Sequence, residues 1–111
     1  MNLEDTAQGL QQEFRRGTLI MLVLSQLKQP AYGYHLVKRL NDHQIPMEAN
    51  TLYPLMRRLE TQGLLKSQWD TTEAKPRQYY VITEDGQQVL DKVKNYWREF
   101  TDNVNSLLEE E

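Results

Sequence analysis

The fold is decided by the stretch Asn50-Thr51-Leu52-Tyr53-Pro54-Leu55-Met56-Arg57-Arg58-Leu59-Glu60-Thr61-Gln62-Gly63-Leu64-Leu65. Its apolar residues recur at i, i+3, i+4 and i+7, which is the spacing of one face of an α-helix; they are Leu52, Leu55, Met56 and Leu59. The rest of that helical surface carries polar side chains, namely Thr51, Tyr53, Arg57, Arg58 and Gln62. The pattern predicts a short helix with one buried face and one basic, hydrogen-bonding face.

The two ends of this helix are also marked in the sequence. Pro54 fits most easily in a first helical turn, where its missing N–H costs little, so we expect the N-cap at Asn50 or Thr51. Gly63 is expected to end the helix. A helix of this kind, apolar on one side and rich in donors on the other, can lie in the major groove of DNA.

Two further helices are expected before this segment. The first runs from about residue 5 to 28, and its part Thr18–Leu24 is apolar nearly all round, so a partner subunit is expected to bury it. The second begins near Tyr32-Gly33, with Tyr34, Val37 and Leu40 as its buried face. Ile45-Pro46-Met47 is expected to be a short edge strand, because Pro46 cannot donate to a ladder.

A hairpin and a last helix are expected after it. Leu64–Trp69 and Arg77–Ile82 read as strands joined by a polar loop, residues 70–76, and Thr83 is expected to cap the helix that follows. That helix carries a heptad, with Leu90, Trp97 and Val104 at one position and Val93, Phe100 and Leu107 at the other. Three such heptads predict association of helices between subunits.

Composition and charge narrow the class of protein. The 111 residues suit one compact domain, divided here into residues 1–82 and a C-terminal helix, residues 83–111, and there is no cysteine. The net charge of −3 hides a basic body, because residues 14–82 hold ten Lys and Arg against five Asp and Glu. The longest apolar run, Leu19–Leu24, is too short to cross a bilayer, and the N-terminus lacks a signal-peptide pattern. A cytoplasmic protein that binds a polyanion is expected.

The order of these elements is that of a winged helix-turn-helix: mostly α with a small β-hairpin, plus a C-terminal dimerisation helix. A closer resemblance is carried by Tyr32-Gly33-Tyr34, Thr51-Leu52-Tyr53-Pro54-Leu55, Arg58-Leu59-Glu60, Gly63-Leu64-Leu65, Arg77-Gln78-Tyr79-Tyr80 and Thr83-Glu84-Asp85-Gly86. Over about residues 10–108 the chain resembles the PadR family of bacterial transcriptional regulators. Its single short C-terminal helix resembles the smaller subgroup, which includes multidrug-sensing repressors.

The resemblance implies a homodimer that binds double-stranded DNA, with the third helix in the major groove and the hairpin on the backbone or minor groove. The candidate DNA-binding residues are Asn50, Thr51, Tyr53, Arg57, Arg58, Lys75, Arg77, Gln78, Tyr32, Gly33 and Lys38. Each has a structural alternative: Asn50 and Thr51 can be caps, the tyrosines can pack, Arg58 can form an anchoring salt bridge, and the others can be solvated surface.

A second set of residues is expected at the dimer interface, where the resemblance implies a space for small planar aromatic effectors. Its members are Trp97, Phe100, Phe14, Thr18, Met21, Val93 and Val104. Aromatic side chains at such a centre bind flat molecules by stacking. The structural alternative is that Trp97 serves only as an interface core residue.

Catalysis and metal binding are not expected. His35 and His43 have neither cysteines nor ordered carboxylates beside them, and no glycine-rich phosphate loop or nucleophile elbow occurs. No cofactor is therefore predicted. The tip Glu73-Ala74-Lys75-Pro76-Arg77 departs from the family pattern, whose wings often carry glycines and more arginines, so this wing is expected to be stiffer and to contact fewer phosphates.

The leading hypothesis is a homodimeric repressor, released from a two-fold symmetric operator by a small aromatic ligand or another signal. One alternative is a winged helix used only for protein interaction through its acidic last helix. Another is a ligand-binding protein without DNA activity. A DNA shift separates the first from the other two, and tryptophan quenching by planar aromatics without a DNA shift would indicate the last.

Overall fold

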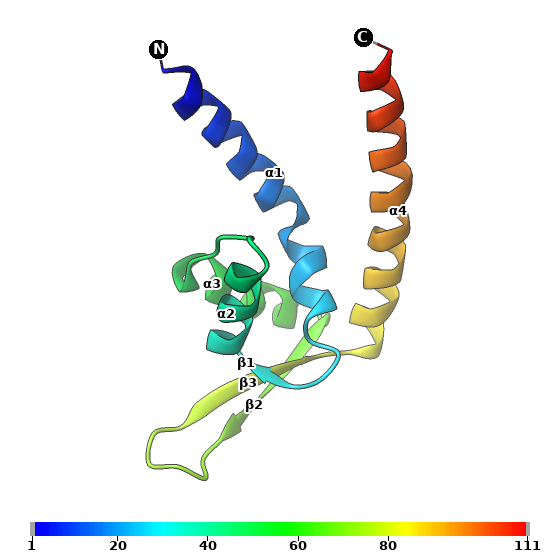
Figure 1. Cartoon of the computed structure of the whole chain (residues 1–111). Coiled ribbons are helices and arrows are strands. Elements are labelled where there is room, and N and C mark those ends of the chain that lie inside the picture. Colours follow the sequence, from blue (N-terminus) through cyan, green and yellow to red (C-terminus); the bar gives the residue numbers. More distant parts are fainter. Residues whose placement is uncertain (1, 111) are drawn as a thin grey trace.

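The computed structural model describes residues 2–110 and contains four helices and three strands within them. The helices are α1 (Leu3–Ser25), α2 (Gly33–Asp42), α3 (Ala49–Thr61) and α4 (Glu84–Glu109), and the strands are β1 (Ala31–Tyr32), β2 (Leu65–Asp70) and β3 (Arg77–Ile82). In Figure 1, α2 and α3 pack beside the lower half of α1, and the β2–β3 hairpin projects below them. The upper parts of α1 and α4 extend away from this body. The expected winged-helix fold with a C-terminal helix is confirmed.

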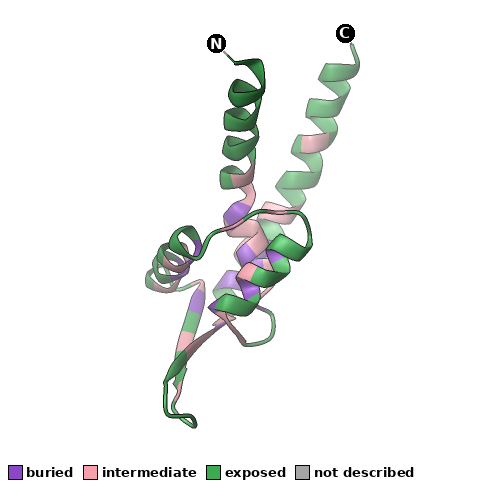
Figure 2. Cartoon of the chain, turned by 60° about the vertical axis from the view of Figure 1, so that its left-hand side comes forward, coloured by how far each residue is buried: buried purple, intermediate pink, exposed green. Residues whose placement is uncertain are grey.

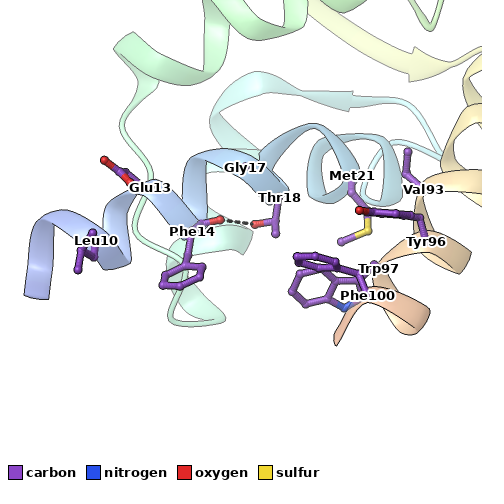
Figure 3. A pocket seen from close by; sticks show the side chains of 10 residues that line it. All are labelled: Leu10, Glu13, Phe14, Gly17, Thr18, Met21, Val93, Tyr96, Trp97 and Phe100. Carbon is purple, nitrogen blue, oxygen red and sulfur yellow. Dashed lines mark hydrogen bonds between the residues drawn. The ribbon is translucent and has the colours of Figure 1, made fainter. Parts of the chain in front are cut away.

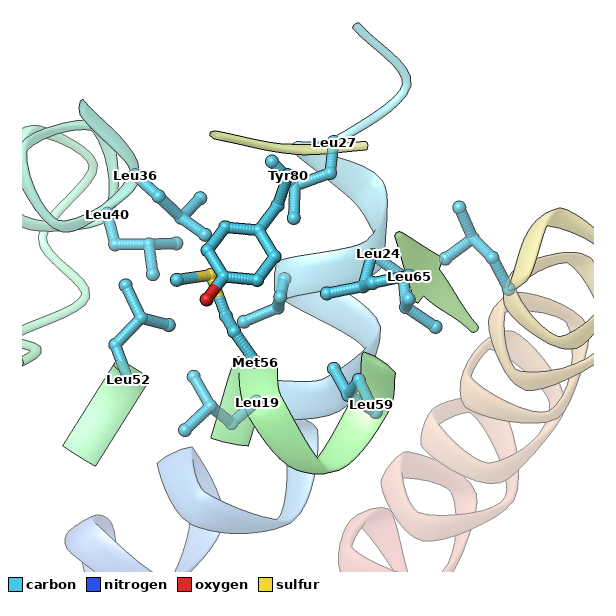
Figure 4. Packing of buried hydrophobic residues seen from close by; sticks show 12 residues of the cluster. Leu19, Leu24, Leu27, Leu36, Leu40, Leu52, Met56, Leu59, Leu65 and Tyr80 are labelled. Carbon is cyan, nitrogen blue, oxygen red and sulfur yellow. The ribbon is translucent and has the colours of Figure 1, made fainter. Parts of the chain in front are cut away.

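The hydrophobic core lies where the second half of α1 meets α2, α3 and the sheet. Figure 4 shows the ring of Tyr80 at its centre, beside Met56 of α3. Its buried residues are Leu19, Val23, Leu24, Leu27, Leu36, Leu40, Leu52, Met56, Leu59, Leu65, Tyr80 and Leu90. Figure 2 shows that the outer halves of α1 and α4 are almost entirely exposed. The core therefore fixes α3 and the sheet, whereas the two long helices reach beyond it.

The α3 helix begins earlier than the sequence indicated. Its N-cap is Glu48, whose carbonyl accepts the N–H of Leu52 at 3.1 Å, so the expected N-cap at Asn50 or Thr51 is wrong. Both of those residues lie in the first turn, and Pro54 falls in the second turn, where it has no N–H to give the Asn50 carbonyl. Packing of the apolar face of α3 outweighs this missing hydrogen bond.

The other end of α3 confirms the expected glycine stop. Gly63 has a φ of 81°, which an L side chain adopts only with strain. The N–H of Leu64 bonds the carbonyl of Leu59 at 2.9 Å, and the N–H of Gly63 bonds that of Glu60 at 3.0 Å. This is a Schellman motif, and it turns the chain directly into β2.

The sheet is antiparallel, with strand order β1-β3-β2. Ala31 pairs with Tyr80, so the edge strand comes from the segment before α2, and the expected edge strand at Ile45-Pro46-Met47 is wrong. The side chain of Asn41 explains the difference, since its amide donates to the Met47 carbonyl at 3.1 Å and its oxygen accepts the Met47 N–H at 3.4 Å. These bonds replace the strand partners of that segment.

The buried face of α2 is shifted relative to the expectation. Leu36 and Leu40 are buried, one turn apart, and Val37 is half-buried. Tyr34 was expected in the core, but it is 47% exposed and faces the hairpin instead. The helix therefore presents a tyrosine to the β2–β3 hairpin.

The α4 helix is joined to the body through its first turn. The hydroxyl of Thr83 accepts the N–H of Gly86 at 3.0 Å and donates to the Gly63 carbonyl at 2.6 Å, which confirms the expected cap. Leu90 enters the core one turn later, and the helix then continues into open space. Within residues 2–110, no helix combines the length and apolarity needed to cross a membrane.

Candidate nucleic-acid interface

The outward face of α3 carries the side chains expected to contact DNA. Asn50, Thr51, Arg57 and Arg58 are all exposed, and no salt bridge to either arginine occurs within residues 2–110. The structural alternatives of capping and of an anchoring ion pair are therefore not realised for these side chains. They form an exposed polar and basic strip along the helix.

Tyr53 combines packing with partial exposure. It is half-buried, and its ring lies against the first residue of α2, Gly33, which is itself buried. A Cβ atom added to Gly33 would lie 2.4 Å from Cε1 of Tyr53. Only glycine allows this approach of the ring, so a side chain at position 33 would displace the Tyr53 ring from its place against the start of α2.

The start of α2 is tied to the hairpin by tyrosines. The rings of Tyr32 and Tyr34 stack with centroids 5.7 Å apart, and the Tyr32 hydroxyl donates to Oδ2 of Asp70 at 2.6 Å. This hydrogen bond, with two from Thr72, lowers the pKa of the Asp70 carboxyl to about 2. The same bond raises the pKa of the Tyr32 phenol, because the ionised phenol cannot donate to the carboxylate. Tyr32 thus fixes the end of β2 that adjoins the loop of the wing, which is defined here as β2, β3 and the loop 71–76.

Arg77 lies at the centre of this cluster. Its guanidinium donates from Nη1 to the Tyr34 hydroxyl at 3.1 Å and from Nη2 to Oε2 of Glu73 at 2.6 Å. Its Cζ is 5.6 Å from the ring centroid of Tyr32 and 6.0 Å from that of Tyr34, within the range of cation–π attraction. The aromatic pair therefore holds the guanidinium of this wing residue against the start of α2.

These groups surround a hollow of about 430 Å³ between α2, α3 and the wing. Its lining contains six residues expected from the sequence and three that were not, Tyr34, Trp69 and Pro76; together they are Tyr32, Gly33, Tyr34, Tyr53, Trp69, Lys75, Pro76, Arg77 and Gln78. Cationic and hydroxyl donors at one concave site suit the phosphates of a nucleic-acid backbone. The i, i+4 spacing of Leu36 and Leu40 was the available signal that Tyr34 lies outside the core.

Two other expected contact residues have partners inside the chain. Gln78 is half-buried and donates from Nε2 to the Ser67 hydroxyl at 2.9 Å, and that hydroxyl donates to the Glu60 carboxylate. This chain of bonds connects both strands of the wing to α3. Lys38 is exposed and pairs with Asp42 at 2.9 Å, one turn along α2.

A second site lies between α1 and α4, and it brings together six of the seven residues expected for an interface or effector. Figure 3 shows Trp97 and Phe100 of α4 facing Met21 of α1 across an apolar groove of about 540 Å³. The groove is lined by Leu10, Glu13, Phe14, Gly17, Thr18, Met21, Val93, Tyr96, Trp97 and Phe100. Val104, the seventh expected residue, lies outside this lining, and Tyr96, which stacks on Phe100 at 5.5 Å, was not expected. The i, i+4 spacing of the two aromatics was its available signal.

The element order, the exposed donor face of α3 and the cationic wing define a winged helix-turn-helix DNA-binding protein. A family model described as the transcriptional regulator PadR-like family matches residues 20–92. The chain belongs to this family of transcriptional regulators. In the described residues, no cluster of three or more His, Cys, Asp or Glu is arranged to hold a metal ion.

Similar proteins agree with this assignment. The crystal structure of a PadR family transcriptional regulator from Eggerthella lenta is 59% identical, with a TM-score of 0.93 and coverage of 96% of both chains. The structure of a PadR-like transcription factor from Bacteroides fragilis is 31% identical, with a TM-score of 0.75, 89% of this chain covered and 98% of the other. Transcriptional regulator Rv3488 of Mycobacterium tuberculosis is 30% identical over 70% of this chain and 74% of its own.

Proposed function

We propose that this regulator is a homodimeric repressor that binds a two-fold symmetric operator in the cytoplasm, where the chromosome lies. Each copy would place α3 in one half-site, about one helical turn of DNA from the other. A small planar aromatic molecule, or another signal, would release the operator. The observation that carries this proposal is the large exposed apolar surface of α1 and α4, in a chain that also exposes the polar and basic strip of α3.

The size of that surface supports a second copy. The chain exposes 8380 Å², whereas a compact monomer of this mass exposes about 6,400 Å². Its radius of gyration is 16.5 Å, against about 13 Å for a compact domain of this length. The exposed area therefore exceeds that of a compact monomer by more than the roughly 800 Å² per partner that a stable interface buries. The exposed large apolar side chains of the two helices are Leu3, Leu10, Phe14, Tyr96, Trp97, Phe100, Val104, Leu107 and Leu108.

The DNA-binding roles follow from exposure and position. Asn50, Thr51, Tyr53, Arg57 and Arg58 would meet base edges or phosphates from α3, because side chains of a recognition helix reach into the major groove. Lys75 and Arg77 of the wing, with Tyr32 at the start of α2 and Lys38 farther along that helix, would contact the backbone, which positions the protein without reading sequence.

Two of the candidate positions would act mainly through structure. Gly33 would contribute its backbone and its lack of a side chain, which lets Tyr53 approach. Gln78 would hold the wing against α3 through Ser67 while the edge of the wing meets the backbone.

The groove between α1 and α4 is the proposed effector site. Phe14, Thr18, Met21, Val93, Trp97 and Phe100 line it, and the same surface is the one proposed for dimerisation, with Val104 farther along α4. A ligand stacked there would favour one arrangement of the two subunits over another. By population shift, it would change the spacing of the two α3 helices and release the operator.

A mobility-shift assay on the DNA upstream of the chain's own gene tests the proposed function. The wild-type protein is expected to shift this fragment, with log affinity falling against log salt by about 0.9 per neutralised phosphate. Failure to shift any promoter fragment in low salt would contradict the DNA-binding proposal.

The effector part has a separate reporter, because the two tryptophans lie in different sites. The variant Trp69→Phe keeps only Trp97, so quenching of its fluorescence by planar aromatics reports the groove alone. Quenching together with release of DNA supports the proposal. Quenching with no DNA binding under any condition supports a ligand-binding protein instead.

A further inference from the structure

The two carboxylates of the wing have different surroundings. Asp70 accepts hydrogen bonds from Tyr32 and from the backbone and hydroxyl of Thr72, so it is committed to holding the junction between β2 and the loop of the wing. Glu73 has a single polar partner within residues 2–110, the guanidinium of Arg77, at 2.6 Å. Glu73 therefore contributes little to holding the wing in shape, and its contact with Arg77 is open to a functional explanation.

Glu73 occupies donors that a phosphate would use. Carboxylates and phosphates bind the same N–H groups of a guanidinium, with similar geometry. The Glu73 side chain is 64% exposed and the Arg77 side chain 42% exposed, and an ion pair this open is weak and easily exchanged. The guanidinium would stay in place after exchange, because Tyr34 and the ring of Tyr32 hold it independently of Glu73.

We propose that Glu73 is an internal competitor for DNA phosphate at Arg77, so that the wing holds the DNA backbone less tightly than its cations permit. The inference rests on the proposed contact between the wing and DNA. A phosphate that reaches Arg77 must displace the carboxylate and remain near its negative charge. Because phosphates carry no sequence information, the effect applies equally to every DNA sequence.

The variant Glu73→Gln tests the proposal, with a random-sequence duplex as the probe and fluorescence anisotropy as the measurement. The interaction energy of two unit charges about 4 Å apart in water corresponds to roughly a fivefold change in affinity. The variant is expected to bind about fivefold more tightly than wild type. The slope of its log affinity against log salt concentration is expected to steepen by up to about 0.9, which corresponds to one additional neutralised phosphate.

Two further variants separate this effect from a general change in charge. Asp102→Asn makes the same charge change at an exposed residue in the outer half of α4, which extends away from the wing in Figure 1, and this variant is expected to leave affinity unchanged. In an Arg77→Gln background, Glu73→Gln is expected to add nothing, because its effect passes through Arg77.

An unchanged affinity of Glu73→Gln, an equal gain in Asp102→Asn, or a gain that persists without Arg77 would each overturn the inference. These results leave the proposed function intact, since they all require wild-type binding. If the wild-type protein binds no duplex at all, the proposed function and this inference both fall.

Discussion

Replacing Gly86 by alanine should loosen the joint between α4 and the body. A Cβ atom at this position would lie 2.1 Å from the Leu64 carbonyl oxygen and 2.7 Å from Cγ1 of Ile82. The carbonyl is backbone and cannot rotate away as a side chain could. An ordinary contact begins at 3.4 Å, so α4 and Leu64, the residue just before β2, must separate by more than an ångström.

The cost follows from what that separation disrupts. Leu64 accepts the N–H of Thr83 at 3.1 Å, and the Thr83 hydroxyl caps α4 through Gly86. The lost backbone bond costs about 1 kcal/mol, the weakened cap about 1 kcal/mol, and the overpacking about 1–3 kcal/mol. The higher helix propensity of alanine offsets about 1 kcal/mol of this loss. The free energy of unfolding should fall by about 2–4 kcal/mol.

Urea denaturation at one fixed protein concentration measures this change, since dimerisation would make stability depend on concentration. The melting temperature should fall by about 8–16 °C, at roughly 4 °C per kcal/mol for a domain of this size. Gly9→Ala is the matched control, because no heavy atom lies within 4 Å of its added Cβ, and it should stabilise α1 by up to about 1 kcal/mol. A Gly86→Ala protein as stable as Gly9→Ala would refute the reasoning.

Three other predictions concern the sites. Trp97→Ala removes a side chain that is 42% exposed, which is about 100 Å² of exposed area per chain available for burial in a dimer. Dimerisation, measured by sedimentation velocity, should weaken at least tenfold. Arg57→Ala should weaken operator binding by about 1–3 kcal/mol if Arg57 contacts a base. An unchanged affinity in a titration would show that Arg57 is not one of the residues that read the DNA sequence. Because the pKa of Asp70 is lowered to about 2, its contribution to stability is present above pH 4 and lost as the pH falls toward 2. In Tyr32→Phe, carbon NMR should show that carboxyl titrating nearer its ordinary value, and an unshifted titration would contradict the assigned hydrogen bond.

The periodic parts of the chain were the most predictable from sequence. The apolar spacing of Leu52, Met56 and Leu59 fixed the inward face of α3, and Gly63 marked its end. These features depend on contacts between near neighbours in the chain. The two strands of the wing and the Thr83 cap were predictable for the same reason.

Features that depend on distant contacts were not predictable. The edge strand forms at Ala31–Tyr32 because β3 lies beside it, and no local pattern reveals that pairing. The start of α3 that was inferred from Pro54 lies too late in the chain, because the packing of the helix tolerates a proline in its second turn.

The candidate DNA-binding site shows the same division. The positions of Arg57 and Arg58 on the outer face of α3 followed from helical spacing. The cluster in which Arg77 contacts Tyr34 joins residues 43 apart in sequence. Sequence reasoning therefore found the charges of the wing but not the partners that position them.

The central claim is that two copies of this chain together present two α3 helices to one symmetric DNA site. Native mass spectrometry of the protein with the fragment upstream of its own gene tests it most directly. Two chains per duplex, with the same two-chain species present before DNA is added, is the expected result. One chain per duplex, from protein that stays monomeric at micromolar concentration, would contradict it.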